Sequence, residues 1–358
     1  MTESSRPEDR REPDREPDRE PDREPTAAAD TDSDAGTAGD EPPRRFGLTT
    51  FVLAGRHAPG LFGVGWLATL LGAGFVGIVA FGVAGLAGSV LFLVGLLLAS
   101  IGLVLLGGSQ AVERRAAGEA YAGPSPIIVF LAILSISRLT GFVVGLPLSL
   151  IGSSIPVPVG DLIAEIVQAA VFLGVIALMV VGPGALAWRE MGLGRRSAEA
   201  ARGLLGGAVF AGPLILVTSI VGYVAVQLVG VAPASPLPPT GTTLGLGLHL
   251  IAGAVIAPVV EEVVFRGFAL SAWRRTSGPT RAIVLSSIFF VLAHVLFVGG
   301  DKFGDSARLA LVGGVIRVPI AFTLGWLYVR TGSLWAPVGL HAAFNGILIV
   351  LGELAVLH

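Results

Sequence analysis

Long apolar stretches, separated by short polar, glycine-rich or proline-rich segments, fill the chain from residue 46 to residue 358. Nine of these stretches have close to the ~20 residues that an α-helix needs to cross a bilayer. They cover residues 61–82, 86–107, 127–148, 161–187, 203–230, 246–271, 281–299, 308–328 and 335–355. The first two are joined by only a few residues and could form a re-entrant pair, so the pattern predicts eight or nine spans. The predicted fold class is all-α, a polytopic transmembrane helical bundle.

The composition agrees with a membrane protein. Of 358 residues, 53% are hydrophobic and 14% are charged, whereas a soluble domain carries about 25% charged residues. The 50 glycines suit closely packed transmembrane helices. Cysteine is absent, which excludes disulfides, thiolate metal sites and a cysteine nucleophile.

Residues 1–45 differ from the rest of the chain. They hold 15 acidic and 8 basic side chains and include the repeat REPD-REPD-REPD-REPT over residues 11–26. A proline at every fourth position blocks a helix, and almost no apolar side chain is available to bury. We predict a disordered, solvated N-terminal tail, with docking of a partner as the alternative role.

Basic residues concentrate in alternate loops, which predicts the orientation of the chain. With the N-terminus in the cytoplasm, the inside loops hold ten arginines and the outside loops hold two basic residues. The ten are Arg114, Arg115, Arg189, Arg195, Arg196, Arg202, Arg274, Arg275, Arg281 and Arg330; the two are Lys302 and Arg308. We therefore predict a multi-pass protein of the cell membrane whose C-terminus lies outside if there are nine spans.

Two adjacent carboxylates and an arginine interrupt the sixth apolar stretch, in the sequence PVVEEVVFRG at residues 258–267. A charge at the middle of a span costs about 2.5–3.5 kcal/mol, so it is a functional candidate by default. Glu262 and Arg266 are four residues apart, share a helix face and can pair. Glu261 points elsewhere, as a general base or a metal ligand would. Pro258 frees a backbone carbonyl, which suits a hydrated cavity.

Two later spans add imidazole and amide groups at similar depth. The sequence FFVLAH places Phe290 and His294 four residues apart, and HAAFN places His341 and Asn345 at the same spacing. At 1.5 Å per residue, these groups and Glu261 lie roughly 9–20 Å below the cytoplasmic surface. We expect the two carboxylates, the two imidazoles and the amide to meet at one level.

The intramembrane polar residues also have structural interpretations. A single buried histidine is commonly a hydrogen-bonded strut between helices, and the Glu262–Arg266 pair fits a structural role as well as a chemical one. His249, near the outer end of its span, is expected at the membrane interface. Four further polar residues stand isolated in spans, and we interpret them as packing partners or snorkelling residues. They are Arg138, Glu165, Gln168 and Arg317.

Three motifs in order carry a family resemblance. They are EExxxR (Glu261, Glu262, Arg266), FxxxH (Phe290, His294) and HxxxN (His341, Asn345). Together they resemble the CPBP intramembrane proteases, which include the type II CAAX prenyl proteases and the bacteriocin-processing or self-immunity (Abi) proteins. The resemblance covers residues 246–350 by motif. The HExxH, GxGD and GxSG motifs of other intramembrane proteases are absent from the sequence.

The resemblance implies an endopeptidase in which Glu261 and His294 activate the attacking water. His341 and Asn345 would stabilise the oxyanion, and Glu262 with Arg266 would orient the site. The same residues have been described in the family as metal ligands, so the cofactor is either none or a Zn²⁺ ion bound by the Glu and His side chains. The protease domain would cover residues 126–358, behind a transmembrane hairpin at residues 46–125.

The expected partners are the lipid bilayer and a membrane-embedded or lipid-modified peptide, for example one with a CAAX-like C-terminus, and not a nucleic acid. Two other functions use the same residues. A non-catalytic binding or self-immunity protein would use the pocket without hydrolysis. A proton-coupled transporter would show an internal repeat, and EExxxR has no counterpart in the first half of the chain.

Overall fold

Leucine, valine, alanine and glycine dominate the apolar stretches, and a backbone in lipid must satisfy its hydrogen bonds within its own segment. The computed structural model describes residues 56–151, 155–194, 197–235, 237–296, 298–299 and 303–357. In this part of the chain every regular element is a helix, which confirms the all-α prediction. The predicted disordered tail at residues 1–45 lies outside the described residues.

Eight of the described helical segments are long and apolar enough to cross a membrane, and Pro279–Val295 is a shorter apolar helix. These are the nine predicted stretches. The helices, with π-helical segments marked η, are α1 (Pro59–Ala80), α2 (Gly85–Ala116), α3 (Pro126–Ile151), α4 (Val157–Ile176), η2 (Ala177–Val181), α5 (Ser197–Ala208), α6 (Ala211–Val229), α7 (Thr243–Leu250), η3 (Ile251–Ile256), α8 (Ala257–Glu262), η4 (Val263–Leu270), α9 (Ser271–Ser277), α10 (Pro279–Val295), α11 (Phe303–Thr331) and α12 (Trp335–Leu357).

The stretch predicted at residues 203–230 is divided into α5 and α6. Pro213 explains the division, because it has no N–H to donate to the carbonyl of Val209 four residues earlier. The stretch predicted at residues 281–299 is shorter in the structure and ends at Val295 as α10.

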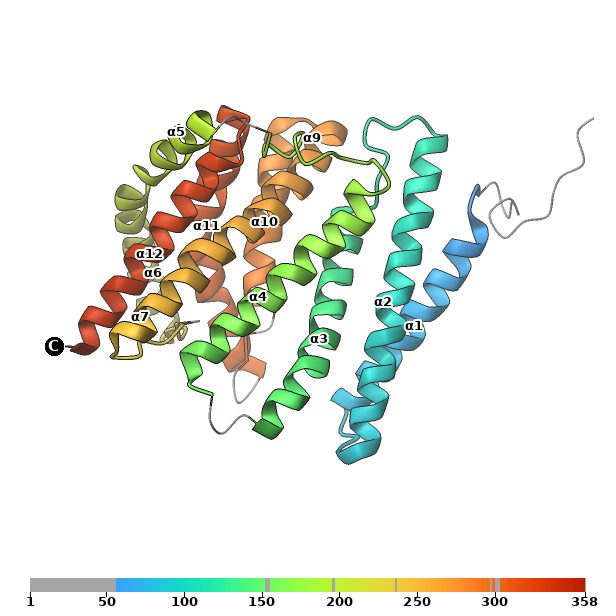
Figure 1. Ribbon diagram of the computed structural model, residues 1–358, viewed down its shortest axis with the longest axis horizontal. Helices are drawn as coiled ribbons and strands as arrows, with labels where there is room; N and C mark the ends of the chain where they lie inside the picture. The colour runs from blue at the N-terminus through green and yellow to red at the C-terminus, as the bar shows by residue number, and fades with distance from the viewer. Residues whose placement is uncertain are drawn as a thin grey trace, which may run out of the picture. The chain divides into compact units, whose positions relative to one another are not determined.

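The helices pack around the segment that runs from α7 to α9. α4, α10, α11 and α12 contact this segment, while α2 packs on α3 and α1 packs on α2 (Figure 1). On the far side of α12 lies α5, and the two helices meet backbone to backbone. A side chain at Gly339 would collide with the backbone of Leu204, and one at Gly207 with the backbone of Ala336.

The segment Thr243–Ser277 is a continuous helix in which α8 stands between two π-helical segments, η3 and η4. In η3 the N–H of Ala257 bonds to the carbonyl of Ala252, five residues earlier. In the same pattern the next N–H would bond to the carbonyl of Gly253, but the next residue is Pro258, which has no N–H. The carbonyl of Gly253 is therefore left for a partner from another helix. Single-turn π segments of this kind are frequent at functional sites.

Candidate active site

Two carboxylates and two imidazoles from three helices come together. Glu261 and Glu262 end α8, His294 lies in the last turn of α10, and His341 lies in the second turn of α12. Glu261 Oε2 is 3.4 Å from His294 Nε2 and 3.8 Å from His341 Nε2. The structure therefore brings together four of the five groups that were expected to meet.

The Glu262–Arg266 pair forms the buried base of the site. Arg266 Nη1 donates to Glu262 Oε1 at 2.9 Å, and both side chains are fully buried. Arg266 Nη2 donates to the carbonyl of Ala321 on α11 at 3.1 Å, and the guanidinium carbon lies 4.5 Å from the centre of the Phe290 ring. Removing one partner would leave an uncompensated buried charge, at a cost of about 3–5 kcal/mol.

The orientation of His341 is set by the same carboxylate. His341 Nδ1 lies 2.9 Å from Glu262 Oε1, and a carboxylate accepts, so Nδ1 carries the hydrogen. The opposite nitrogen, Nε2, faces Glu261. Glu262 thus fixes the tautomer of His341 while Arg266 balances its charge.

His294 is oriented by Phe290, one turn earlier on α10. Its Nδ1 donates to the carbonyl oxygen of Phe290 at 2.8 Å, so in the neutral ring Nε2 holds the lone pair. The two ring centres are 4.2 Å apart, and the Phe290 ring is also 5.9 Å from the imidazole of His341. One phenylalanine therefore contacts both imidazoles and the Arg266 guanidinium, which gives the FxxxH spacing a physical reason.

Glu261 Oε2 is the point on which both imidazoles converge. It is buried and accepts no hydrogen bond from any described residue. Two neutral Nε2 atoms and a carboxylate oxygen are all acceptors, so a water molecule among them could donate hydrogens to two of the three. The arrangement suits the activation of a water by a general base.

Asn345, the fifth predicted group, contacts a different partner. Its Nδ2 donates at 2.9 Å to the carbonyl of Gly253, the oxygen left without a donor by Pro258. Asn345 also lines a separate cavity of about 320 Å³ with Gly253 and His249. An amide nitrogen carries two hydrogens, so this bond uses one of its two donors.

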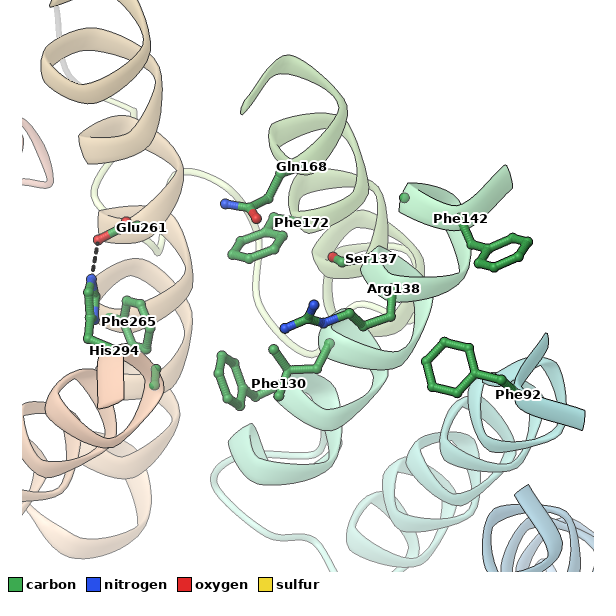
Figure 2. A pocket seen from close by; sticks show the side chains of 13 residues that line it. Phe92, Phe130, Ser137, Arg138, Phe142, Gln168, Phe172, Glu261, Phe265 and His294 are labelled. Carbon is green, nitrogen blue, oxygen red and sulfur yellow. Dashed lines mark ion pairs between the residues drawn. The ribbon is translucent and has the colours of Figure 1, made fainter. Parts of the chain in front are cut away.

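A cavity of about 630 Å³ leads from Glu261 and His294 to α3 and α4 (Figure 2). Its wall is rich in phenylalanine and includes Phe92 from α2. Arg138 on α3 and Gln168 on α4, interpreted from the sequence as packing or snorkelling residues, line it too. The signal that could have found them is the one that singled out Glu261, a polar side chain in mid-span. Arg138 and Gln168 form no local motif, because the other polar residues that line the cavity lie on helices distant in the sequence.

Two other polar predictions compare with the structure as follows. His249 is buried, with 1% of its surface exposed, and its Nε2 lies 3.2 Å from Asp161 Oδ2 on α4. The ring therefore packs against a neighbouring helix, and its predicted depth at the membrane interface stays a prediction. Arg317 donates to the carbonyl of Gly313 within its own helix. Among the described residues, no group of three or more His, Cys, Asp and Glu side chains is placed to hold a metal ion.

Residues 243–347, which include all three motifs, match the family described as type II CAAX prenyl endopeptidase Rce1-like. A relative from Bacillus subtilis (strain 168), named "Putative membrane peptidase YdiL", is 25% identical over 104 residues. That alignment covers 29% of this chain and 37% of the relative. No solved structure matches the chain. The two matches confirm the resemblance to the CPBP family that the motifs indicate.

Proposed function

We propose, from the CPBP-family character of residues 243–347, that the chain is an intramembrane endopeptidase that hydrolyses a peptide bond with an activated water. The observation that carries this proposal is Glu261 Oε2, which is buried, accepts no hydrogen bond from the described part of the chain, and faces the Nε2 atoms of His294 and His341. Hydrolysis needs a base beside the water and donors for the oxyanion.

In the proposed reaction a water lies between Glu261 and His294 and attacks the carbonyl carbon of the substrate. One hydrogen of the water passes to the Glu261 carboxylate as the new C–O bond forms. The carbonyl oxygen becomes the oxyanion of a tetrahedral intermediate. The C–N bond then breaks, and the proton held by Glu261 goes to the leaving amine, so that a carboxylic acid and an amine are released.

The remaining residues position these groups. Asn345 offers its second amide hydrogen to the oxyanion, and His341, held through Nδ1 by Glu262, is the other proposed donor, from Nε2 when its ring is protonated. Glu262 and Arg266 keep His341 in place and do not contact the substrate. A Zn²⁺ ion is the alternative; Glu261 and the two histidines would have to rearrange to hold it, since as placed they form no metal-binding group, and it would polarise the carbonyl and lower the pKa of the water.

The cavity indicates the kind of substrate. Its phenylalanine-rich wall suits a membrane-embedded or lipid-modified peptide, including one with a CAAX-like C-terminus. The protease role of residues 126–358 and a site open to the cytoplasmic half of the bilayer belong to the same proposal.

The test is cleavage of a peptide library by the purified protein and by its Glu261→Gln variant, which keeps the shape of the side chain. We expect the variant to lose at least 10²-fold in kcat, because the base is removed. Glu119→Gln, a change at an exposed loop carboxylate 3.4 Å from Arg114, is the matched control and should keep full activity. Cleavage that survives Glu261→Gln would contradict the proposal and favour a binding protein.

A chelator series on the same preparations separates the two mechanisms. A metal-free reaction should keep its rate after dialysis against a chelator. Loss of cleavage that added Zn²⁺ restores would establish the metal form.

A further inference from the structure

We infer that Arg317 on α11 is the cation that stabilises the oxyanion formed during hydrolysis of the peptide bond. This inference rests on the proposed peptidase function and adds to it a residue outside the three motifs. In the resting site the Arg317 guanidinium attracts the Glu261 carboxylate. After Glu261 has taken the proton of the water, the guanidinium remains beside the new negative charge on the substrate.

The register of α11 places Arg317 level with Glu261. Two hydrogen bonds join α11 to the helix Thr243–Ser277: Arg266 Nη2 donates to the carbonyl of Ala321 at 3.1 Å, and the hydroxyls of Ser271 and Tyr328 are 2.8 Å apart. The partners are 55 residues apart in the first bond and 57 in the second. Because this spacing barely changes, the two helices run in parallel. Counting back 55 and 57 residues from Arg317 gives residues 262 and 260, on either side of Glu261.

Arg317 also lies on the face of α11 that packs against the site. It precedes Ala321 by four residues, so the two side chains share one helix face. Ala321 is fully buried in a cluster with Phe265 and Phe290. The Arg317 side chain is partly buried, and its Nη1 donates to the carbonyl of Gly313 at 2.9 Å. This bond fixes the position of the guanidinium and uses one of its five N–H groups.

The charges of the site divide into two pairs. Arg266 lies 2.9 Å from Glu262, so its charge is matched there, although it also attracts Glu261. Glu165 on α4 is a third carboxylate, and its charge acts on Glu261 with the same sign. Among the described arginines, Arg317 is therefore the one whose charge is matched by the reacting carboxylate itself.

The proposed reaction moves negative charge from Glu261 to the substrate. The oxygen of the water bonds to the carbonyl carbon, its proton passes to Glu261, and the electron pair of the C=O double bond passes to the carbonyl oxygen. The total charge is unchanged, but a charge spread over two carboxylate oxygens becomes localised on one. A fixed cation stabilises the localised charge more strongly, and this difference lowers the barrier. The low-dielectric surroundings strengthen the effect.

The test compares two inhibitors built on a peptide that the wild type cleaves. One carries an anionic, tetrahedral phosphinate in place of the scissile bond, and the other a neutral ketomethylene group. In Arg317→Met we expect kcat and the affinity for the phosphinate to fall about 10- to 100-fold. The affinity for the ketomethylene peptide and KM should be unchanged. Methionine costs less than arginine in lipid, so the variant should fold.

Two further variants complete the comparison. In Arg317→Lys the charge remains but its position changes, so we expect a smaller loss that is again confined to the phosphinate and kcat. Arg308→Met removes an exposed arginine from the same helix and is the matched control. It should bind both inhibitors as the wild type does.

Unchanged affinity of Arg317→Met for the phosphinate would overturn the inference. An equal loss for both inhibitors would also overturn it, because Arg317 would then only support the fold. If Arg317→Met does not fold, the same comparison is made on Arg317→Lys, where an unchanged or an equal affinity loss overturns the inference too. If the wild type cleaves no peptide, the proposed function fails, and the inference fails with it.

Discussion

At the scale of single residues, Asn345 connects a backbone irregularity with the proposed chemistry. Pro258 removes the N–H that would bond to the carbonyl of Gly253 in the π-helical pattern, and Asn345 Nδ2 supplies the missing hydrogen bond at 2.9 Å. The HxxxN motif therefore has a structural reason independent of catalysis. Its catalytic role as a second donor to the oxyanion is a prediction that mutagenesis can separate from the structural one.

The separating experiment combines Asn345→Ala with Pro258→Ala. Asn345→Ala leaves the carbonyl of Gly253 without a donor, so we expect a loss of about 1–3 kcal/mol in stability, measured as a lower thermal midpoint. Pro258→Ala restores a backbone N–H next to that carbonyl and should recover part of the loss in the double variant. If Asn345 also binds the oxyanion, kcat should fall by about 10²–10³-fold in both the single and the double variant.

The outcomes are easily distinguished. Recovery of both the thermal midpoint and kcat in the double variant would mean that Asn345 acts only on the backbone. A midpoint that never falls would contradict the structural role.

At the scale of elements, contact between α5 and α12 positions one of the two histidines. Gly339 lies two residues before His341 on α12, and a side chain there would collide with the backbone of Leu204. Because the backbones of α5 and α12 are in direct contact here, no flexible side chain can move aside. A side chain added at Gly339 must therefore displace one of the two helices.

We predict that Gly339→Ala lowers stability by about 1–3 kcal/mol through overpacking and reduces cleavage by shifting His341. The control is Gly346→Ala on the same helix, where an added carbon would lie at an ordinary 3.5 Å from Ala254 Cβ. Thermal midpoints and cleavage rates of the two variants are the measurements. Equal behaviour of the two would show that α12 does not depend on this contact.

The elements also show what the sequence could reveal. Apolar runs of about 20 residues are sufficient to locate helices in lipid, and each predicted stretch corresponds to a helix in the structure. The division between α5 and α6 was open to prediction, since Pro213 is visible in the sequence. The π-helical segments were not, because hydropathy reports composition and not the register of backbone hydrogen bonds.

In the site, contacts within one helix were predictable from the sequence, and contacts between separate helices were not. The Glu262–Arg266 pair was predictable because both residues lie on one helix, four positions apart. The contact from His341 to Glu262 and the place of Arg138 on the cavity wall depend on how separate helices pack. No local spacing encodes that packing.

At the scale of the whole molecule, the orientation in the membrane is a prediction from the ten arginines of the expected inside loops. The absence of cysteine from the chain makes it directly testable with single introduced cysteines. Glu119, between α2 and α3, is expected inside, and Ser235, between α6 and α7, is expected outside. Both side chains are exposed on the protein.

In intact cells, a membrane-impermeant maleimide should label Ser235→Cys and leave Glu119→Cys unlabelled. Both variants should react after permeabilisation, which controls for accessibility of the thiol. The opposite labelling pattern would invert the predicted topology.

The hairpin of α1 and α2 lies outside the region that matches the family, residues 243–347, yet Phe92 of α2 closes part of the cavity wall. It therefore contributes to the proposed substrate chamber, although the family match does not cover it. A chain trimmed to its three motifs would keep every proposed catalytic group, but acyl chains of the surrounding lipid would then have a way into the chamber and would compete with the peptide.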